Sequence, residues 1–89
     1  MEIHLQIKIH TSDNEIVLEY SKVYQSNTAP SIGSAIKDPL FAEHKRIIDV
    51  IFDYSEDKCF VRLEPRLDTK ERLQGHIQEV AEMHNWKLL

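Results

Sequence analysis

The first ten residues alternate strictly between polar and apolar side chains, which predicts a half-buried β-strand over residues 2–10. Turn-forming residues follow at 11–14, and the alternation then resumes in residues 15–20. Apolar residues have odd numbers in the first strand and even numbers in the second, so they share one face only if paired numbers add to an odd number. We therefore expect a hairpin with these pairs: His10 with Glu15, Ile9 with Ile16, Ile7 with Leu18 and Leu5 with Tyr20.

A second hairpin is predicted over residues 46–64, around a turn at 55–57. Its charges select one register, in which Asp53 faces Lys58. A slip of one residue would turn Lys58 toward the apolar face, at the cost of burying a charge. The remaining pairs of this register are Asp49 with Arg62, Phe52 with Cys59, Val50 with Val61 and Ile48 with Leu63.

The opposite face of this second hairpin carries three apolar residues among its ion pairs, namely Ile47, Ile51 and Phe60. A fully solvated face needs no such residues. We therefore expect this face to be covered, either by a second layer from the same chain or by a partner in an interface.

A helix is predicted over residues 68–85, because Asp68 followed by Glu71 is typical of a capping box. Its apolar stripe comprises Leu73, Ile77, Val80, Ala81 and His84 and should pack on the apolar face of the sheet. Gly75 lies inside this helix and is expected to weaken it by about 1 kcal/mol relative to alanine.

The connection over residues 26–45 is longer than ordinary loops and should contain an element of its own. Pro30 favours one helical turn, whereas Gly33 counts against a helix, so we prefer a short strand. We expect this segment to cover the sheet as a lid, with Ile32, Ile36, Leu40 and Phe41 above Ile47, Ile51 and Phe60. It serves either to close the core or to leave a cleft beneath it.

Together these elements predict a single α+β domain over residues 1–89. Two antiparallel hairpins would form a curved sheet of four to five strands that bends toward a partly closed barrel. One C-terminal helix would pack on one face of that sheet.

Composition narrows the class of protein. A net charge of −4 with scattered acidic residues disfavours binding to nucleic acid, and no apolar run is long enough to span a membrane. We therefore expect a cytoplasmic protein without a membrane partner. Cys59 is the only cysteine, so one chain cannot form an internal disulfide.

No catalytic, cofactor or metal site is predicted. His4 and His10 stand roughly 20 Å apart along one strand, too far to hold one ion. Asp49 and Asp53 lie about 13 Å apart and each has a cationic partner, which indicates ion pairs instead of acid and base catalysis. The sequence contains neither a glycine-rich phosphate loop nor a nucleophile elbow.

These exclusions favour a small accessory or regulatory module that binds another protein or a second copy of itself. The predicted contacts are the face of Ile47, Ile51 and Phe60, and a corner formed by Met83 and Trp86. The alternative is a small-molecule-binding domain, or less readily an enzyme, with a pocket under residues 31–41. Its polar groups would be His44, Arg46 and Tyr54.

Overall fold

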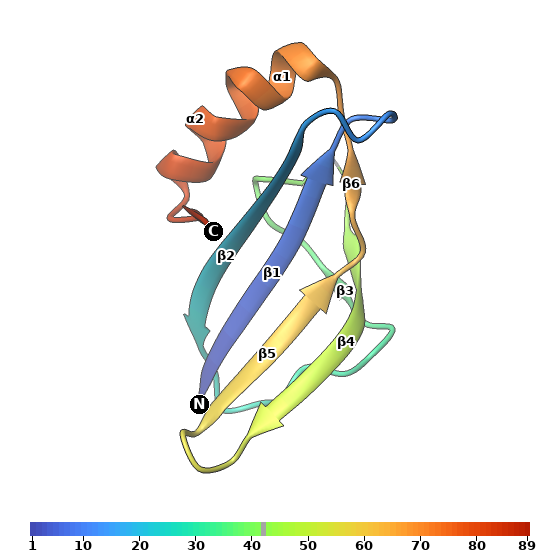
Figure 1. Cartoon of the computed structure of the whole chain (residues 1–89). Helices are drawn as coiled ribbons and strands as arrows, with labels where there is room; N and C mark the ends of the chain where they lie inside the picture. The colour runs from blue at the N-terminus through green and yellow to red at the C-terminus, as the bar shows by residue number, and fades with distance from the viewer. Residues whose placement is uncertain (42) are drawn as a thin grey trace.

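The computed structural model describes residues 1–41 and 43–89. In this part of the chain a strand-rich region is followed by two short helices near the C-terminus (Figure 1). The elements are β1 (Glu2–His10), β2 (Val17–Gln25), β3 (Ala35–Ile36), β4 (Lys45–Asp53), β5 (Lys58–Leu63), β6 (Arg66–Leu67), α1 (Lys70–Gln74), α2 (His76–Met83) and β7 (Lys87–Leu88). The predicted α+β class is confirmed.

The strands of the described residues form one curled sheet in the order β3-β4-β5-β1-β2-β7, with β6 beside the end of β1. The hairpins β1–β2 and β4–β5 are antiparallel, as predicted, but β1 and β5 run parallel. The prediction of an antiparallel sheet of four to five strands was therefore wrong in part, because this sheet is mixed and has seven strands. A parallel neighbour requires a crossover, and the long connection between the hairpins provides it.

The register of β1 and β2 differs from the prediction by two residues, because His10 pairs with Val17 and not with Glu15. The turn is longer than expected. The N–H of Thr11 donates to the carbonyl oxygen of Ile16 at 3.0 Å, and the Thr11 hydroxyl accepts from the Ile16 N–H at 3.2 Å. These bonds close a loop in which Asn14 adopts a φ of 59°. The shift is even, so the predicted apolar residues still share one face.

The register of β4 and β5 is confirmed from Asp53 with Lys58 as far as Asp49 with Arg62. Beyond this point a β-bulge replaces the predicted pair of Ile48 with Leu63 by a pair of Ile47 with Leu63. A bulge adds one residue to one strand and so exchanges the faces of the residues beyond it. Ile47 is therefore buried in the core, and Ile48 is exposed.

The single helix predicted over residues 68–85 was wrong, because helical geometry is interrupted at Gly75, whose φ and ψ are −139° and −83°. The N–H of Gly75 donates to the carbonyl oxygen of Arg72 and ends α1. The N-cap is Thr69 and not Asp68, since the Thr69 hydroxyl accepts from the Arg72 N–H. The apolar stripe nevertheless reaches the core through Leu73, Ile77 and Ala81.

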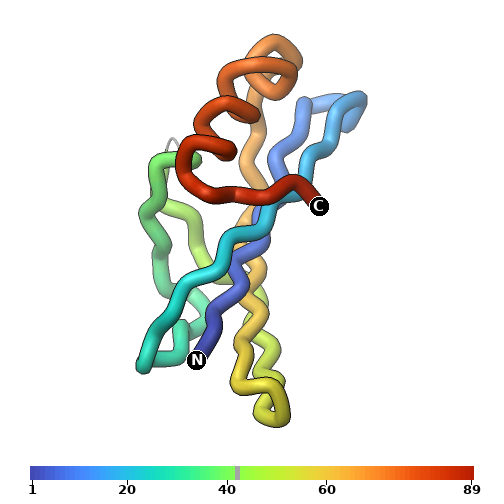
Figure 2. The backbone as a smooth tube through the Cα atoms, turned by 90° about the vertical axis from the view of Figure 1, so that its left-hand side faces the viewer, coloured from blue at the N-terminus to red at the C-terminus, as the bar shows by residue number. Residues whose placement is uncertain are grey.

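We call the sheet face that bears Ile3, Leu5, Ile7 and Ile9 the inner face, and the opposite one the outer face. The helices and the described residues of the connection, 26–41 and 43–45, lie on the same side of the sheet (Figure 2). This side is the inner face, because the buried core includes residues from all of these segments. Among the described residues, no helix is both long and apolar enough to cross a membrane.

The connection contains the two-residue strand β3, which pairs with β4, and Gly33 turns the chain before it with a φ of 89°. The predicted lid was placed over the wrong face. Leu40 and Phe41 are buried in the same core as Ile47, whereas Ile32 is 66% exposed. The bulge that turns Ile47 inward explains part of this error. Polar contacts that hold the connection on the inner face explain the rest.

Candidate functional site

A buried carboxylate, Asp38, holds the connection against the inner face. Its side chain is 1% exposed. One oxygen, Oδ2, accepts from Lys22 Nζ at 2.9 Å and from the Tyr24 hydroxyl at 2.7 Å. The other oxygen, Oδ1, accepts from Trp86 Nε1 at 2.9 Å and from the Leu40 N–H at 3.0 Å. We call these five residues the Asp38 clamp. It joins β2, the connection and the C-terminal segment.

The charges of the clamp stabilise one another. Burial by itself would raise the pKa of Asp38, but the hydrogen bonds from Leu40, Tyr24, Lys22 and Trp86 outweigh it and leave the pKa below its ordinary value. For Lys22, burial would lower the pKa, and the contacts with Tyr24 and Asp38 raise it instead. Both groups are therefore charged at neutral pH. The Lys22 ammonium also lies 5.0 Å from the centre of the Tyr24 ring.

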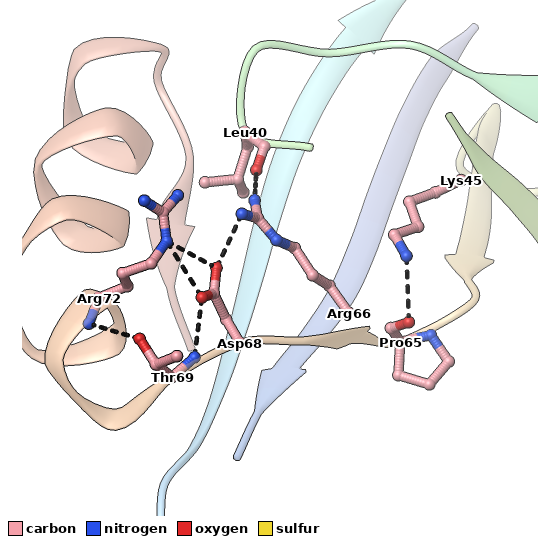
Figure 3. A network of polar contacts seen from close by, with 7 residues as sticks. All are labelled: Leu40, Lys45, Pro65, Arg66, Asp68, Thr69 and Arg72. Carbon is pink, nitrogen blue, oxygen red and sulfur yellow. Dashed lines mark hydrogen bonds and ion pairs between the residues drawn. The ribbon is translucent and has the colours of Figure 1, made fainter. Parts of the chain in front are cut away.

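A second polar network holds the other side of the connection (Figure 3). The guanidinium of Arg66 donates to the carbonyl oxygen of Leu40 and lies 2.8 Å from Asp68 Oδ2. Asp68 also contacts Arg72 Nε at 3.0 Å. Burial would raise the pKa of Asp68, but the Thr69 N–H and the two arginines lower it. Leu40 is thus held through both its N–H and its carbonyl oxygen, which fixes the connection at this residue.

Two of the residues predicted to contact a partner lie in the interior instead. Ile47 is 1% exposed because of the bulge, and Trp86 is 4% exposed because it belongs to the Asp38 clamp and packs on Phe41 at 5.7 Å between ring centres. The predicted corner of Met83 and Trp86 is therefore not a surface. Met83 alone is exposed, and its contact with a partner stays a prediction.

The polar groups of the predicted pocket do not come together. His44 is exposed and lines an open hollow beside Lys37 and Phe41. The Arg46 guanidinium donates to the carbonyl oxygen of Gly33 at 3.0 Å. Tyr54 lies at the far end of the hairpin, about 25 Å from Arg46 along β4. It stacks on Phe52 at 5.7 Å between ring centres.

A groove does exist beside the connection, lined in part by the segment over residues 31–41 but not by the predicted polar groups. It has a volume of about 470 Å³. Its walls include Ile3, Leu5, Tyr24, Pro30, Ile36 and Lys37. These side chains come from the start of β1, the end of β2 and the segment over residues 29–37. The groove is mainly apolar and open to solvent.

The outer face carries a continuous row of apolar and aromatic side chains across four strands. Cross-strand pairing sets Val23 beside His4, His4 beside Phe60, and Phe60 beside Ile51. We call these four residues the outer row. The rings of His4 and Phe60 lie 5.0 Å apart between centres. Val23 is 50% exposed and Ile51 is 59% exposed, and the described residues provide no second layer over them.

Two polar rows border the outer row. One consists of Ser21, Gln6, Arg62 and Asp49, and the other of Gln25, Glu2, Lys58 and Asp53. Arg62 and Asp49 form an ion pair at 3.3 Å, and His4 Nε2 lies 3.0 Å from Glu2 Oε1. An apolar centre within a polar rim is the arrangement of protein-binding surfaces.

The other titratable groups offer little chemistry. Within residues 1–41 and 43–89, no three His, Cys, Asp or Glu side chains gather around a point that could hold a metal ion. Cys59 is buried, and burial raises the pKa of its thiol, so the reactive thiolate is scarce at neutral pH. The buried side-chain polar atoms of this part of the chain all have partners. Polar groups therefore serve to hold the fold, and the outer row is the candidate functional site.

Sequence reasoning found Ile51 and Phe60 but missed His4 and Val23. His4 was considered only as a metal ligand. Val23 lies on the polar side of β2, and an apolar residue at such a position could have indicated an apolar row on the outer face. The place of His4 beside Phe60 depends on the parallel pairing of β1 with β5, which no local pattern indicates.

Comparison with other proteins adds no relative: no family model, curated protein or solved structure matches this chain.

Proposed function

We propose that the protein is a non-catalytic binding module whose outer row docks against another protein. The observation that carries this proposal is the outer row itself, an apolar strip that crosses four neighbouring strands and is left uncovered by the residues that the structure describes. Contiguous exposed apolar surface with a polar border is typical of sites of protein association. Scattered exposed apolar residues would support no such proposal.

The inner face supports the proposal by contrast, because its apolar residues are covered within the chain. There the chain buries its apolar residues with helices, the connection and a fully paired carboxylate. The covering segments all lie on that side (Figure 2). Since the covering segments of the described residues are held on the inner side, the outer face is left available to a partner.

The proposal is tested by crosslinking in the cells that produce the protein. A photoreactive phenylalanine analogue replaces Ile51 in one variant and Ile32 in a matched control. Both isoleucines are exposed, at 59% and 66%, but only Ile51 lies in the outer row. We expect irradiation to give a defined covalent adduct from position 51 and none from position 32. Mass spectrometry then identifies the attached protein. A third variant labelled at Met83 tests the other predicted contact.

Equal yields from positions 51 and 32 would contradict the proposal, because they would show collision and not docking. The same conclusion would follow if position 51 gave no adduct while the protein was present in the cells at a normal level. A thermal melt of each variant checks that the analogue leaves the fold intact.

The groove beside the connection supports a second candidate function, the binding of a small apolar molecule. Its volume of about 470 Å³ lies within the range of small-molecule sites, which are mostly apolar with few polar groups. Tyr24 and Lys37 would supply those polar groups. This site replaces the predicted one of His44, Arg46 and Tyr54.

A thermal-shift screen of amphipathic metabolites tests this second function. A true ligand should raise the melting temperature of the wild type and lose its effect in an Ala35→Trp variant, whose indole fills the groove. A screen without hits, or hits that act equally on Ala35→Trp, would contradict it.

A further inference from the structure

The charges beside the outer row are arranged so that two copies of the face complement each other. The row on one side of it contains Glu2 in β1 and Lys58 in β5, which are direct neighbours. The row on the other side contains Gln6 in β1 and Arg62 in β5, also direct neighbours. In both rows the cation belongs to β5, and its acidic or amide counterpart belongs to β1.

From this arrangement we propose that the outer row is the centre of a twofold-symmetric interface between two copies of this chain. The axis runs parallel to the strands, between β1 and β5. This inference rests on the proposed function and names its partner. A twofold axis brings the same patch of both copies together, so every contact occurs twice.

A rotation about this axis places β1 of one copy opposite β5 of the other copy. It places Glu2 against Lys58 of the second copy, and Gln6 against Arg62. Within the outer row it places His4 against Phe60. The flanking strands are exchanged in the same way, so β2 of one copy faces β4 of the other, and Val23 meets Ile51. Within these three rows, each charged side chain of β1 and β5 therefore meets an opposite charge or an amide, and each apolar one meets an apolar or aromatic side chain.

The other twofold axis that keeps the strands of the two copies aligned runs across the strands, and the charges oppose it. It would exchange the two polar rows, so that Lys58 would face Arg62 and Asp49 would face Asp53. Like charges placed opposite each other in an interface cost several kcal/mol. The face thus allows self-association in one orientation and opposes the alternative.

The curvature of the sheet sets the strength of the contact. The sheet curls around the core on its inner face, so the outer face is convex. Two convex faces touch most closely along β1 and β5, the two strands that carry the complementary pairs, and the contacts of Val23 with Ile51 lie at the borders of this area. An interface of this kind buries a small area and is expected to be weak and concentration-dependent.

Sedimentation velocity over a range of protein concentrations tests the inference. The wild type should form dimers as the concentration rises. Glu2→Lys and Lys58→Glu should each weaken the dimer at least about tenfold, because each places like charges in both symmetry-related contacts. Two exposed positions in α1, on the inner side of the sheet, provide matched controls, Glu71→Lys and Lys70→Glu. These make the same changes of charge and should leave the dimer unchanged.

An equimolar mixture of Glu2→Lys and Lys58→Glu gives the decisive result. In a mixed dimer the new lysine meets the new glutamate, and the native lysine meets the native glutamate, so association should return to near the wild-type level. Mixing cannot repair a fold damaged within either chain, which separates docking from misfolding. Each variant is also checked by its own thermal melt.

Three results would overturn the inference: a wild type that stays monomeric at every concentration, a dimer whose affinity neither substitution changes, or an equimolar mixture that does not recover dimer formation. A monomeric wild type leaves the proposed function standing if position 51 crosslinks to a different protein in cells. If position 51 gives no adduct of any kind, the proposed function itself fails.

Discussion

The two faces of the sheet differ in whether a second layer covers their apolar residues. On the inner face, apolar side chains of β1 and β5 lie under the helices and the connection, and the buried polar atoms all have partners among the described residues. On the outer face, the same two strands carry His4 and Phe60 in an apolar row without a covering layer.

This difference separates stability from recognition within one sheet. The Asp38 clamp fixes the connection on the inner side, so it is not available to cover the outer row. A carboxylate with four donors is costly to release, because each donor would be left without its partner. The inner face is thus covered by the helices and the connection, and we propose that a partner covers the outer face.

The largest difference in stability between the two faces should come from substitutions of their ion pairs, with Asp38→Ala on the inner face. This change leaves the mostly buried Lys22 without its counter-ion, and we expect a loss of about 3–5 kcal/mol in the free energy of unfolding. Asp49→Ala on the outer face removes a more exposed ion pair with Arg62 and should cost less than about 1 kcal/mol. Urea denaturation measures both, and similar losses would mean that the clamp does not hold the fold.

A second effect compares two isoleucines that lie four residues apart in β4. Ile47 is 1% exposed, so Ile47→Ala should lower the free energy of unfolding by about 3 kcal/mol. Ile51 is 59% exposed, and Ile51→Ala in dilute protein should change it by less than about 0.5 kcal/mol. If Ile51→Ala proved as costly as Ile47→Ala, the outer row would be covered within the chain.

A smaller effect is expected from Trp86→Phe, which keeps an aromatic ring against Phe41 and removes the indole N–H. Asp38 then retains three of its four donors. We expect a loss of about 1–2 kcal/mol, from one hydrogen bond to a charged group and a slightly smaller ring. Thermal or urea denaturation measures it, and a change near zero would show that the indole N–H does not support the clamp.

The smallest effect concerns pH. The pKa of Asp38 is lower in the folded protein than in the unfolded chain, where it is about 3.9. Its contribution to stability is therefore complete above the unfolded pKa and is lost as the pH falls through the folded one. The difference in unfolding free energy between the wild type and Asp38→Asn should be constant near neutral pH and shrink below about pH 4. A difference that stays constant down to pH 2 would contradict the pKa shift.

Local patterns in the sequence predicted the parts of the fold that depend on neighbouring residues. Alternation placed the residues of β1 on their faces, and charge pairing gave most of the register between β4 and β5. The turn after His10 was read two residues too short, because the Thr11 hydroxyl closes a larger loop through its side chain. Propensity for turns does not reveal such a bond.

The rest depends on contacts between distant residues, which local patterns do not specify. Asp38 and Trp86 are separated by 48 positions, so no local pattern links them. Parallel pairing of β1 with β5 is decided by the path of the connection. The bulge beside Ile48 reversed the faces of two isoleucines, and because these two adjacent residues are identical, the pattern of residue types did not indicate it. These are the features that determine where the outer row lies.

The most direct test of the account compares the methyl groups of Ile47 and Ile51 by NMR with a soluble paramagnetic agent. In dilute protein, the agent should broaden the Ile51 signal strongly and leave the Ile47 signal sharp. As the concentration rises and dimers form, the Ile51 signal should become protected. If Ile51 were as protected as Ile47 in dilute protein, or equally exposed at every concentration, the outer row would not be a surface that a second copy covers.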